Sequence, residues 1–322
     1  MVGLALLALA AAGGIAVGAQ PLPLGGVLRA LYDDTAPAAS VVREVRVPRT
    51  ALALAAGAAL GLSGAVLQSL TRNPLADPGI LGVNTGAACA VVAATVLLGT
   101  DSQAAVVWWA LTGAAVAVVV TYLLGRRGPG RGGPEDLVLA GVAVTAALGA
   151  VVSGLGALDA DAYGALRIWS VGTLAGRELS HLWHLLPFLA AGAVLAFALA
   201  PALNALALGD ESGRALGIAP GRVRLLGTLA TVLLCGAATA AIGPVGFVGL
   251  VAPHCARLLV GPDQRWLMPY AALTGAGLLL VSDLAGRVVA RPAEIQAGIV
   301  TAFIGAPVLV WLICRERTGR RA

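Results

Sequence analysis

Long apolar stretches alternate with short polar connections along almost the whole chain. Most of these stretches contain about 20 residues, the length that an α-helix needs to cross a bilayer. We therefore expect an all-α polytopic membrane protein with about ten transmembrane helices, at residues 2–20, 50–71, 79–99, 105–124, 137–157, 182–203, 223–242, 245–261, 267–286 and 296–314. A signal peptide is the alternative interpretation of residues 2–20, but no basic region precedes this run.

The composition favours a single membrane domain. Of the 322 residues, 59% are hydrophobic and 11% are charged, whereas a soluble globular chain carries about 25% charged residues. A string of soluble domains is therefore excluded, and we treat residues 1–322 as one transmembrane domain. The four cysteines are scattered and form no C-x-x-C pair, so we expect small buried side chains rather than a disulfide or a metal site.

All 21 basic residues are arginine, and the chain contains no lysine. A P-loop needs a lysine that reaches the terminal phosphates of its nucleotide. The chain therefore cannot form an ordinary P-loop, and ATP-driven work would require an ATPase on another polypeptide. No residue pattern indicates catalysis or a cofactor, and the spacing of His181, His184 and His254 does not predict a metal site. We expect a chain that is not an enzyme and has no metal or cofactor of its own.

The arginine distribution predicts the orientation in the membrane. If both termini are cytoplasmic, 13 of the 21 arginines lie on the cytoplasmic side and 8 on the outer side. Cytoplasmic loops of membrane proteins carry the excess of basic residues. Orientation therefore explains the net charge of +5 better than nucleic-acid binding does, and the polar segment 203–224 is predicted to be cytoplasmic.

The 203–224 segment separates two long apolar stretches. We interpret it as two short amphipathic turns, of which Gly209 ends the first. Asp210 is a candidate N-cap of the second turn and Gly217 a candidate C-cap, because a carboxylate accepts free backbone N–H groups and glycine adopts left-handed dihedrals. Such a structured segment favours docking of a soluble partner, whereas the alternative is an ordinary connecting loop.

Three arginines run against the charge bias at the predicted outer surface, namely Arg46, Arg49 and Arg287. An exposed cationic rim can bind acidic groups of a partner or substrate. The alternative is that these side chains extend to lipid phosphates. Asp283 and Arg287 have the i, i+4 spacing of a local ion pair, which we favour over a proton relay.

Two stretches contain glycines and prolines that interrupt a helix, at residues 72–82 and 243–254. Transporters place moving or substrate-lining elements at paired breaks, and the alternative is an ordinary loop. The residues that we assign to these breaks are Asn73, Pro74, Pro78, Gly243, Pro244, Gly246 and Pro253. A third pattern, Gly57, Gly61 and Gly64, predicts close approach of helix backbones and carries no information on substrate.

Several longer motifs follow one another in a fixed order. They are RVPRTALALAAGAALGLSGAVLQSLTRNPLADPGILG at 46–82, LVLAGVAV at 137–144, WSVGTLAG at 169–176, LNALALGDESGRALG at 203–217, IGPVGFVGLVAPHCARLLVGPDQR at 242–265 and GIVTAFIGAPVLVW at 298–311. Through these motifs the chain resembles the FecCD permeases, from about residue 46 to the C-terminus. These permeases are the membrane subunits of type II ABC importers for iron–siderophore complexes, haem and vitamin B12.

The resemblance implies the type II ABC importer permease fold and a set of partners. These are a second permease subunit, two cytoplasmic ATPase subunits that bind ATP and Mg²⁺, and an outer substrate-binding protein. Arg46, Arg49 and Arg287 would receive acidic residues of the binding protein. The ATPase would dock on the short helices matching 203–217, through Leu206, Leu208, Gly209, Asp210, Glu211, Arg214, Leu216 and Gly217.

Two departures from the family pattern limit what can be transferred. The loop at 132–136 matches the cytoplasmic gate region but differs in sequence from better-known members, so no gate residue is assigned. Gln296 stands where many relatives have proline, which leaves the start of the last helix open.

The leading hypothesis is the permease subunit of an ATP-driven importer of ferric siderophores. Its predicted location is the bacterial cytoplasmic (inner) membrane, in contact with lipid. Haem or cobalamin is the alternative cargo within the same family. The alternative from another class is a secondary transporter driven by an ion gradient, with Asp283 as the titrating group.

Overall fold

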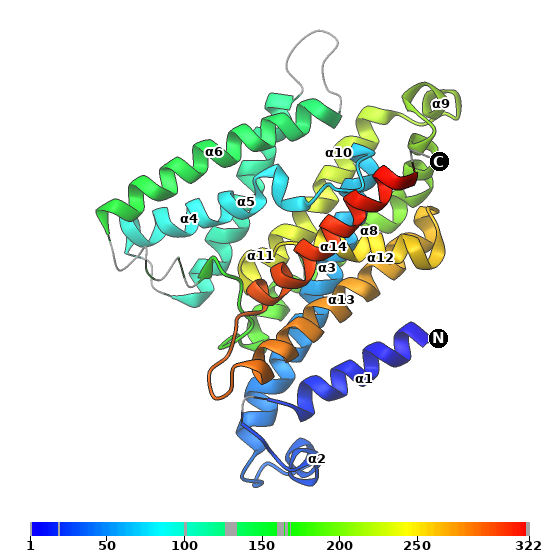
Figure 1. Ribbon diagram of the computed structural model, residues 1–322. Helices are drawn as coiled ribbons and strands as arrows, with labels where there is room; N and C mark the ends of the chain where they lie inside the picture. The colour runs from blue at the N-terminus through cyan, green and yellow to red at the C-terminus, as the bar shows by residue number, and fades with distance from the viewer. Residues whose placement is uncertain are drawn as a thin grey trace.

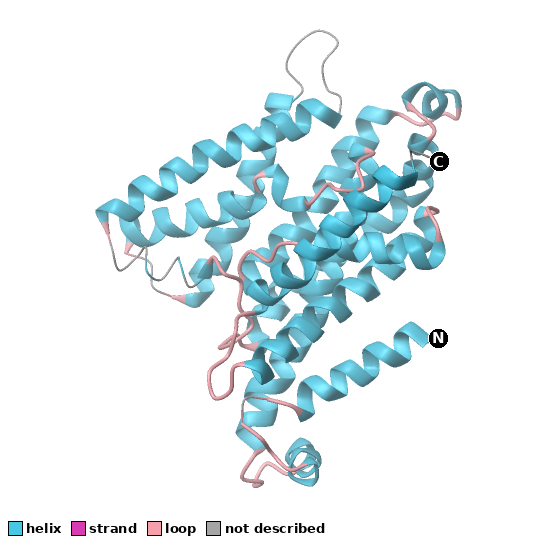
Figure 2. Cartoon of the chain, in the orientation of Figure 1, coloured by secondary structure: helices cyan, strands magenta, loops and turns pink. Residues whose placement is uncertain are grey.

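The computed structural model describes residues 2–18, 20–99, 102–125, 134–159, 164, 167 and 169–319. These residues form helices and loops without a strand (Figures 1 and 2). The helices are α1 (Val2–Ala16), α2 (Leu24–Tyr32), η1 (Val41–Arg46), α3 (Val47–Thr71), η2 (Pro78–Leu81), α4 (Val83–Leu98), α5 (Gln103–Gly125), α6 (Pro134–Leu158), α8 (Leu179–Ala207), α9 (Asp210–Ala215), α10 (Pro220–Thr231), η3 (Val232–Gly236), α11 (Ala237–Ile242), α12 (Val248–Val260), α13 (Gln264–Val289) and α14 (Ala297–Gly319). The predicted all-α polytopic fold is confirmed.

The apolar helices agree with the ten predicted segments. Six of the described helices are long and apolar enough to cross a membrane: Val41–Thr71, Ala105–Gly125, Glu135–Leu158, Leu182–Ala207, Pro220–Ile242 and Gln264–Val289. Four shorter apolar helices complete the set: Val2–Ala16, Val83–Leu98, Val248–Val260 and Ala297–Trp311. Residues 2–16 pack as a helix against α13, which agrees with a first helix of the bundle.

Three helices differ from the predicted segments in their ends or continuity. The second begins nine residues earlier than expected, because the π-helical turn η1 runs directly into α3. The predicted 79–99 helix is divided at Gly82, whose φ of +82° separates the short helix η2 from α4. Pro220–Ile242 is continuous but widens into a π-helical turn, η3, at its centre, a form that is typical of functional sites.

The long helix α3 is the centre of the bundle, with α8, α10, α11, α12 and α13 packed around it. Glycines make this packing possible. A methyl group added at Gly57 would lie 2.5 Å from the Gly275 carbonyl oxygen of α13, and one at Gly61 would lie 2.1 Å from that of Ala271. At Gly64 the corresponding distance to the Gly249 carbonyl oxygen of α12 is 1.8 Å. The predicted close approach of helix backbones is confirmed.

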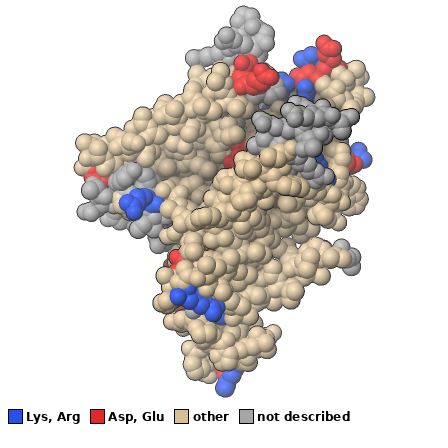
Figure 3. Space-filling model, in the orientation of Figure 1, with Lys and Arg blue, Asp and Glu red and all other residues tan. Residues whose placement is uncertain are grey.

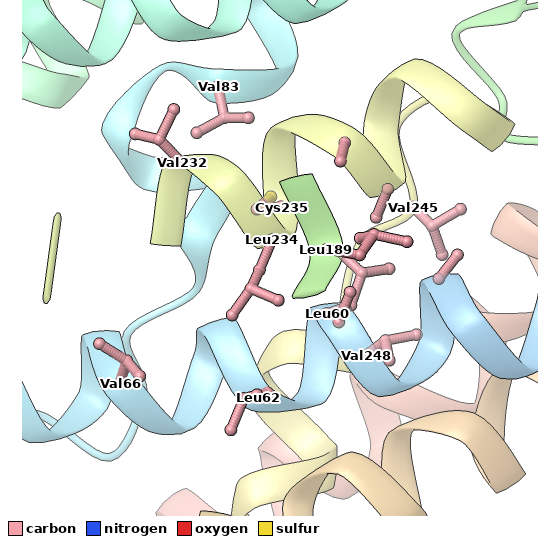
Figure 4. Close-up of a cluster of buried hydrophobic side chains, with 14 of the residues drawn as sticks. Leu60, Leu62, Val66, Val83, Leu189, Val232, Leu234, Cys235, Val245 and Val248 are labelled. Carbon is pink, nitrogen blue, oxygen red and sulfur yellow. The ribbon is translucent and has the colours of Figure 1, made fainter. Parts of the chain in front are cut away.

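The apolar core lies between these central helices. Leu60 of α3 lies on the side of the helix that faces Leu234 and Cys235 of η3 (Figure 4), and Leu62 and Val66 belong to the same buried cluster. The helix flanks carry almost no charged side chains, and the charged residues gather near helix ends (Figure 3). An uncharged flank is what a helix facing hydrocarbon requires, because a charged side chain at mid-bilayer costs about 2.5–3.5 kcal/mol or more.

The bundle has two ends, which we name after the short helices that lie there. The α9 end contains α9, the end of α3 and the start of α10; the α2 end contains α2, the end of α13 and the start of α14 (Figure 1). Of the predicted gate loop 132–136, residues 132 and 133 lie outside the described residues.

Candidate functional site

The corner between α8 and α10 contains one short helix, α9. The first predicted turn is not separate, because residues 203–207 are the last turns of α8. Gly209 then adopts φ +113°, a conformation that other residues rarely adopt. At the end of α9, Gly217 has φ +79°, its N–H bonds to the Arg214 carbonyl, and Ile218 N–H bonds to Gly213. These two bonds are a Schellman motif, so the predicted C-cap is confirmed.

Asp210 does not cap α9, contrary to the sequence-based expectation. The N-cap position is Gly209, and Asp210 is already helical. Its carboxylate instead accepts hydrogen bonds from Arg224 at 2.6 Å and from Arg72. Partial burial acts to raise the pKa of the Asp210 carboxyl, but the charges of Arg224 and Arg72 outweigh it, and the pKa lies below its ordinary value. The two guanidinium groups therefore favour the ionised form of Asp210.

The outer face of the α8–α9 corner combines leucines with charged groups. Leu208 is 69% exposed and Leu216 is 63% exposed, and Glu211 and Arg214 are also exposed. Leu206, in contrast, is buried beneath Gly213, which explains why a glycine is present in so short a helix. A shallow groove of about 700 Å³ begins beside this corner, lined by Arg214, Gly217, Ile218, Ala219, Pro220, Gly221, Arg222 and Leu225. Exposed leucines beside a groove are typical of a docking surface.

The C-cap of α9 gives a direct test of its local geometry. We expect Gly217→Ala to destabilise the corner by about 1 kcal/mol, because alanine at positive φ is strained. The thermal unfolding midpoint of the purified chain in detergent measures this loss. Gly221→Ala is the matched control, since Gly221 lies in α10 with open space at its Cβ position. An equal midpoint for Gly217→Ala and Gly221→Ala would contradict the assignment.

The three arginines predicted to form an exposed outer rim are buried. Arg46, Arg49 and Arg287 are 3%, 5% and 1% exposed. The predicted exposure is therefore wrong, because partners within the chain surround all three guanidinium groups. Their docking role stays a prediction, and an acidic partner residue can reach them only if this end rearranges.

A carboxylate buried between two arginines forms the centre of this cluster. Asp283 of α13 is fully buried and accepts from Arg49 Nη2 at 2.8 Å and from Arg287 Nη2. Arg49 also donates from Nη1 to Glu294 at 2.6 Å, in the loop before α14. The predicted Asp283–Arg287 ion pair is confirmed. Paired on both oxygens, Asp283 has no open side for the proton relay that we considered as the alternative.

Three arginines of the α2 end donate to carbonyl groups in the last turn of α1 or in the residues just after it. Arg46 donates to the carbonyl oxygens of residues 15, 16 and 20 at 2.7–3.1 Å. Arg287 donates to Gly14 at 2.9 Å, and Arg291 to Gly18 at 2.7 Å. The end of a helix leaves carbonyl groups without intrahelical partners, and its dipole favours positive charge there. These arginines therefore hold α1 against α3 and α13.

The first predicted break, residues 72–82, is a compact turn. Arg72 ends α3 with φ +50°, which is uncommon for a residue other than glycine. The Asn73 side chain accepts from Leu75 N–H at 2.9 Å, Pro74 follows it, and Pro78 begins η2. The chain therefore changes direction sharply before α4.

The second predicted break separates α11 from α12. Gly243 has φ +78°, Pro244 and Gly246 follow outside any helix, and Phe247 has φ +68° before α12 begins. Pro253 lies inside α12 and does not end it. The two breaks meet in space, since a methyl group at Gly249 would lie 2.6 Å from the Pro78 ring.

An apolar cavity of about 740 Å³ lies beside the second break. Its wall comes from residues 170–171, from residues 244–247 and from one face of α14, including Ile299 and Phe303. The loop 169–176 is attached to this wall, because Thr173 N–H bonds to the Ile242 carbonyl at 2.8 Å. The role of the breaks in lining a substrate path stays a prediction. Among the described residues, no group of three or more metal-binding side chains occurs.

Sequence reasoning missed Arg72, Arg224 and Glu294 as partners of the predicted residues. Glu294 lies two residues before Gln296, the position where many relatives have proline. Arg72 is the first residue of the RNPLADPGILG motif, and this position is the signal that could have identified it as a functional residue. In the structure α14 begins at Ala297, directly after Gln296, so the start of the last helix is settled.

Similarity to known proteins shows the class of protein to which this helical bundle belongs. The model of the FecCD transport family matches residues 4–315. The chain is 46% identical to the ferric enterobactin transport system permease protein FepD of Escherichia coli strain K12, over 98% of this chain and 95% of that protein. It is 38% identical to the hemin transport system permease protein HmuU of Yersinia pestis, over 86% of this chain and 84% of that protein.

A solved structure agrees with the sequence comparisons. An inward-facing metal-chelate type ABC transporter superposes on the chain with a TM-score of 0.85 and 28% identity, covering 97% of both chains. A bundle of this fold with an exposed helical corner at one end is a membrane permease of an ABC importer. The chain belongs to the FecCD transport family.

Proposed function

We propose that this chain forms the inward path for a ferric siderophore. The observation that carries the proposal is the 46% identity to a ferric enterobactin permease over nearly the full length of both proteins. Haem is the second candidate cargo, supported by the similarity to a hemin permease. Cobalamin, which the sequence also led us to consider as cargo, stays an alternative to the ferric siderophore.

The α9 end is the proposed cytoplasmic side, with both chain termini on that side of a bacterial inner membrane. The excess of arginine in the segments assigned to this side supports the orientation. The exposed leucines and charges of the α8–α9 corner supply a docking surface for one ATPase subunit. The complete importer would contain two permease subunits, two ATPase subunits and an outer binding protein.

ATP and Mg²⁺ belong to the ATPase subunits in this proposal, and the permease needs no cofactor of its own. The absence of lysine from the sequence supports this division, because an ordinary P-loop requires one. The chain itself would supply the conformational change. Nucleotide binding on the partner ATPase would favour one of two conformations of the bundle, through contacts that differ between the two conformations.

Transport in proteoliposomes tests the proposal. The chain is reconstituted with its partner ATPase, and its binding protein is added outside with ferric enterobactin, haemin or cobalamin. We expect ATP-dependent uptake of ferric enterobactin that an uncoupler does not abolish. Uptake that needs an ion gradient and ignores ATP would contradict the proposal in favour of a secondary transporter. ATP-dependent uptake of haemin or cobalamin alone would reassign the cargo.

A further inference from the structure

We propose that Arg72 and the turn that follows it transmit the movement of α9 to α6 and α12. The inference rests on the proposed function, in which a partner ATPase moves α9. Arg72 acts as a positioning residue. Residues 72–82 have a mechanical role that is not part of the proposed function.

Arg72 binds both sides of the α8–α9 corner. Its Nε donates to the Leu206 carbonyl oxygen at 3.0 Å, at the end of α8, and its Nη2 donates to Asp210 of α9. These contacts bridge residues more than 130 positions apart in the chain. Because one planar guanidinium makes both bonds, a displacement of α9 must either displace Arg72 or break them.

The turn after Arg72 is short and bonded within itself. Ala76 N–H bonds to the Asn73 carbonyl at 3.1 Å, and Ile80 N–H bonds to the Asp77 carbonyl at 3.0 Å. The Asp77 side chain also accepts from Gly79 N–H at 2.8 Å. The two prolines of the turn have fixed φ angles. Residues 72–82 therefore move as one piece rather than absorb a displacement.

The far end of this turn contacts three other helices. A methyl group at Gly141 of α6 would lie 2.2 Å from the Ile80 carbonyl oxygen, so backbone touches backbone there. Thr121 of α5 donates to the Leu81 carbonyl oxygen at 3.1 Å. Pro78 lies against Gly249 of α12, the helix that begins after the second break.

Among these helices α6 has the weakest hold on the rest of the bundle. Only 11% of its apolar stretch is buried, against 78% for the stretch that contains α3. It lies at the edge of the bundle and packs mainly on α4, α5 and η2 (Figure 1). Within the chain α6 therefore has few buried contacts that oppose its movement, and η2 is the contact through which residues 72–82 reach it.

The arrangement forms a continuous series of contacts from Asp210 through Arg72 and η2 to Gly141. Coupling along this series is measured by recording ATP hydrolysis and uptake separately. The test uses the complete importer in proteoliposomes with ferric enterobactin as the probe. Three quantities are measured for each variant: the ATPase retained on purification, the ATP hydrolysed and the ferric enterobactin taken up.

We expect Arg72→Gln to retain the ATPase and its hydrolysis but to lower uptake per ATP by about 10-fold, within the usual range of coupling between sites. Glutamine can still donate to the Leu206 carbonyl but cannot pair with Asp210 as a cation. Arg72→Lys keeps the charge and should recover part of the coupling. Both substitutions are polar, and glutamine places an amide nitrogen near the position of the Arg72 Nε, so loss of folding is not the expected effect.

Arg224→Ala is the matched control, because Arg224 pairs with the same carboxylate but belongs to α10. It should lower uptake per ATP less than Arg72→Gln does. An equal loss in both variants would overturn the inference, since the effect would then come from loosening α9. Unchanged coupling in Arg72→Gln would overturn it as well. Absence of ATP-dependent uptake by the unmodified chain would instead overturn the proposed function.

Discussion

Asp283→Ala is expected to destabilise the bundle by about 3–5 kcal/mol, which is the usual cost of removing one member of a buried ion pair. Asp283 is fully buried and is the shared partner of Arg49 and Arg287. Without it, two guanidinium groups stay buried, and Arg49 keeps only Glu294, which lies nearer the surface. Thermal unfolding of the chain in detergent measures the loss.

The exposed pair Arg29–Asp33 supplies the control for Asp283→Ala. Both spacings are i, i+4, but the Arg29 side chain is largely exposed. Asp33→Ala should therefore leave the midpoint nearly unchanged, as exposed pairs contribute about 0–1 kcal/mol. Replacing the buried triad together, as Arg49→Met, Asp283→Leu and Arg287→Met, should restore much of the loss, because no fully buried charge remains and Glu294, which loses Arg49, lies nearer the surface. A similar midpoint for Asp283→Ala and Asp33→Ala would contradict the assignment.

Gly64→Ala is expected to lower stability by about 1–3 kcal/mol or more, the usual effect of adding volume to a packed core. The added methyl group would lie 1.8 Å from the Gly249 carbonyl oxygen, and backbone has no rotamer by which to move away. The contact between α3 and α12 must then open. Because Gly249 also lies against Pro78, the position of the 72–82 turn changes with it.

Gly154→Ala in α6 is the control for the α3 glycines, because nothing lies within 4 Å of its Cβ position. Alanine there should be neutral or stabilising, since alanine has the higher helix propensity. The comparison is made by thermal unfolding in the same detergent. Equal midpoints for the two variants would show that α3 and α12 are not packed backbone to backbone.

Hydropathy was sufficient to predict where the helices lie, because burial in lipid demands about 20 apolar residues whatever their partners are. It could not predict the interruptions. The glycines and prolines of residues 72–82 marked the division at Gly82, although the predicted 79–99 helix ran through it, whereas no proline marks the π-helical turn at Val232–Gly236. The glycines of α3 were predicted to pack closely, but their partners in α12 and α13 have no signal in the local sequence.

The predictions for the candidate site are confirmed where the interacting residues are close together in the sequence. Gly217 and the Asp283–Arg287 pair lie within one or two turns of their partners, and both predictions are confirmed. The errors concern side chains with distant partners. Arg49 lies 234 positions from Asp283, and Asp210 lies 138 positions from Arg72. An arginine near a helix end appeared available to an outside partner only because these internal partners could not be foreseen.

The arginines that bind the end of α1 bear on the order in which the chain assembles during biosynthesis. Translation adds about 5–20 residues per second from the N-terminus, so α1 leaves the ribosome long before Arg287 and Arg291 exist. Until then the Gly14 carbonyl group lacks the donor that Arg287 supplies, whereas Arg46 follows α1 closely and can already bind the carbonyl groups of residues 15 and 16. Because α1 packs on α13, it reaches its final position only after α13 has been inserted.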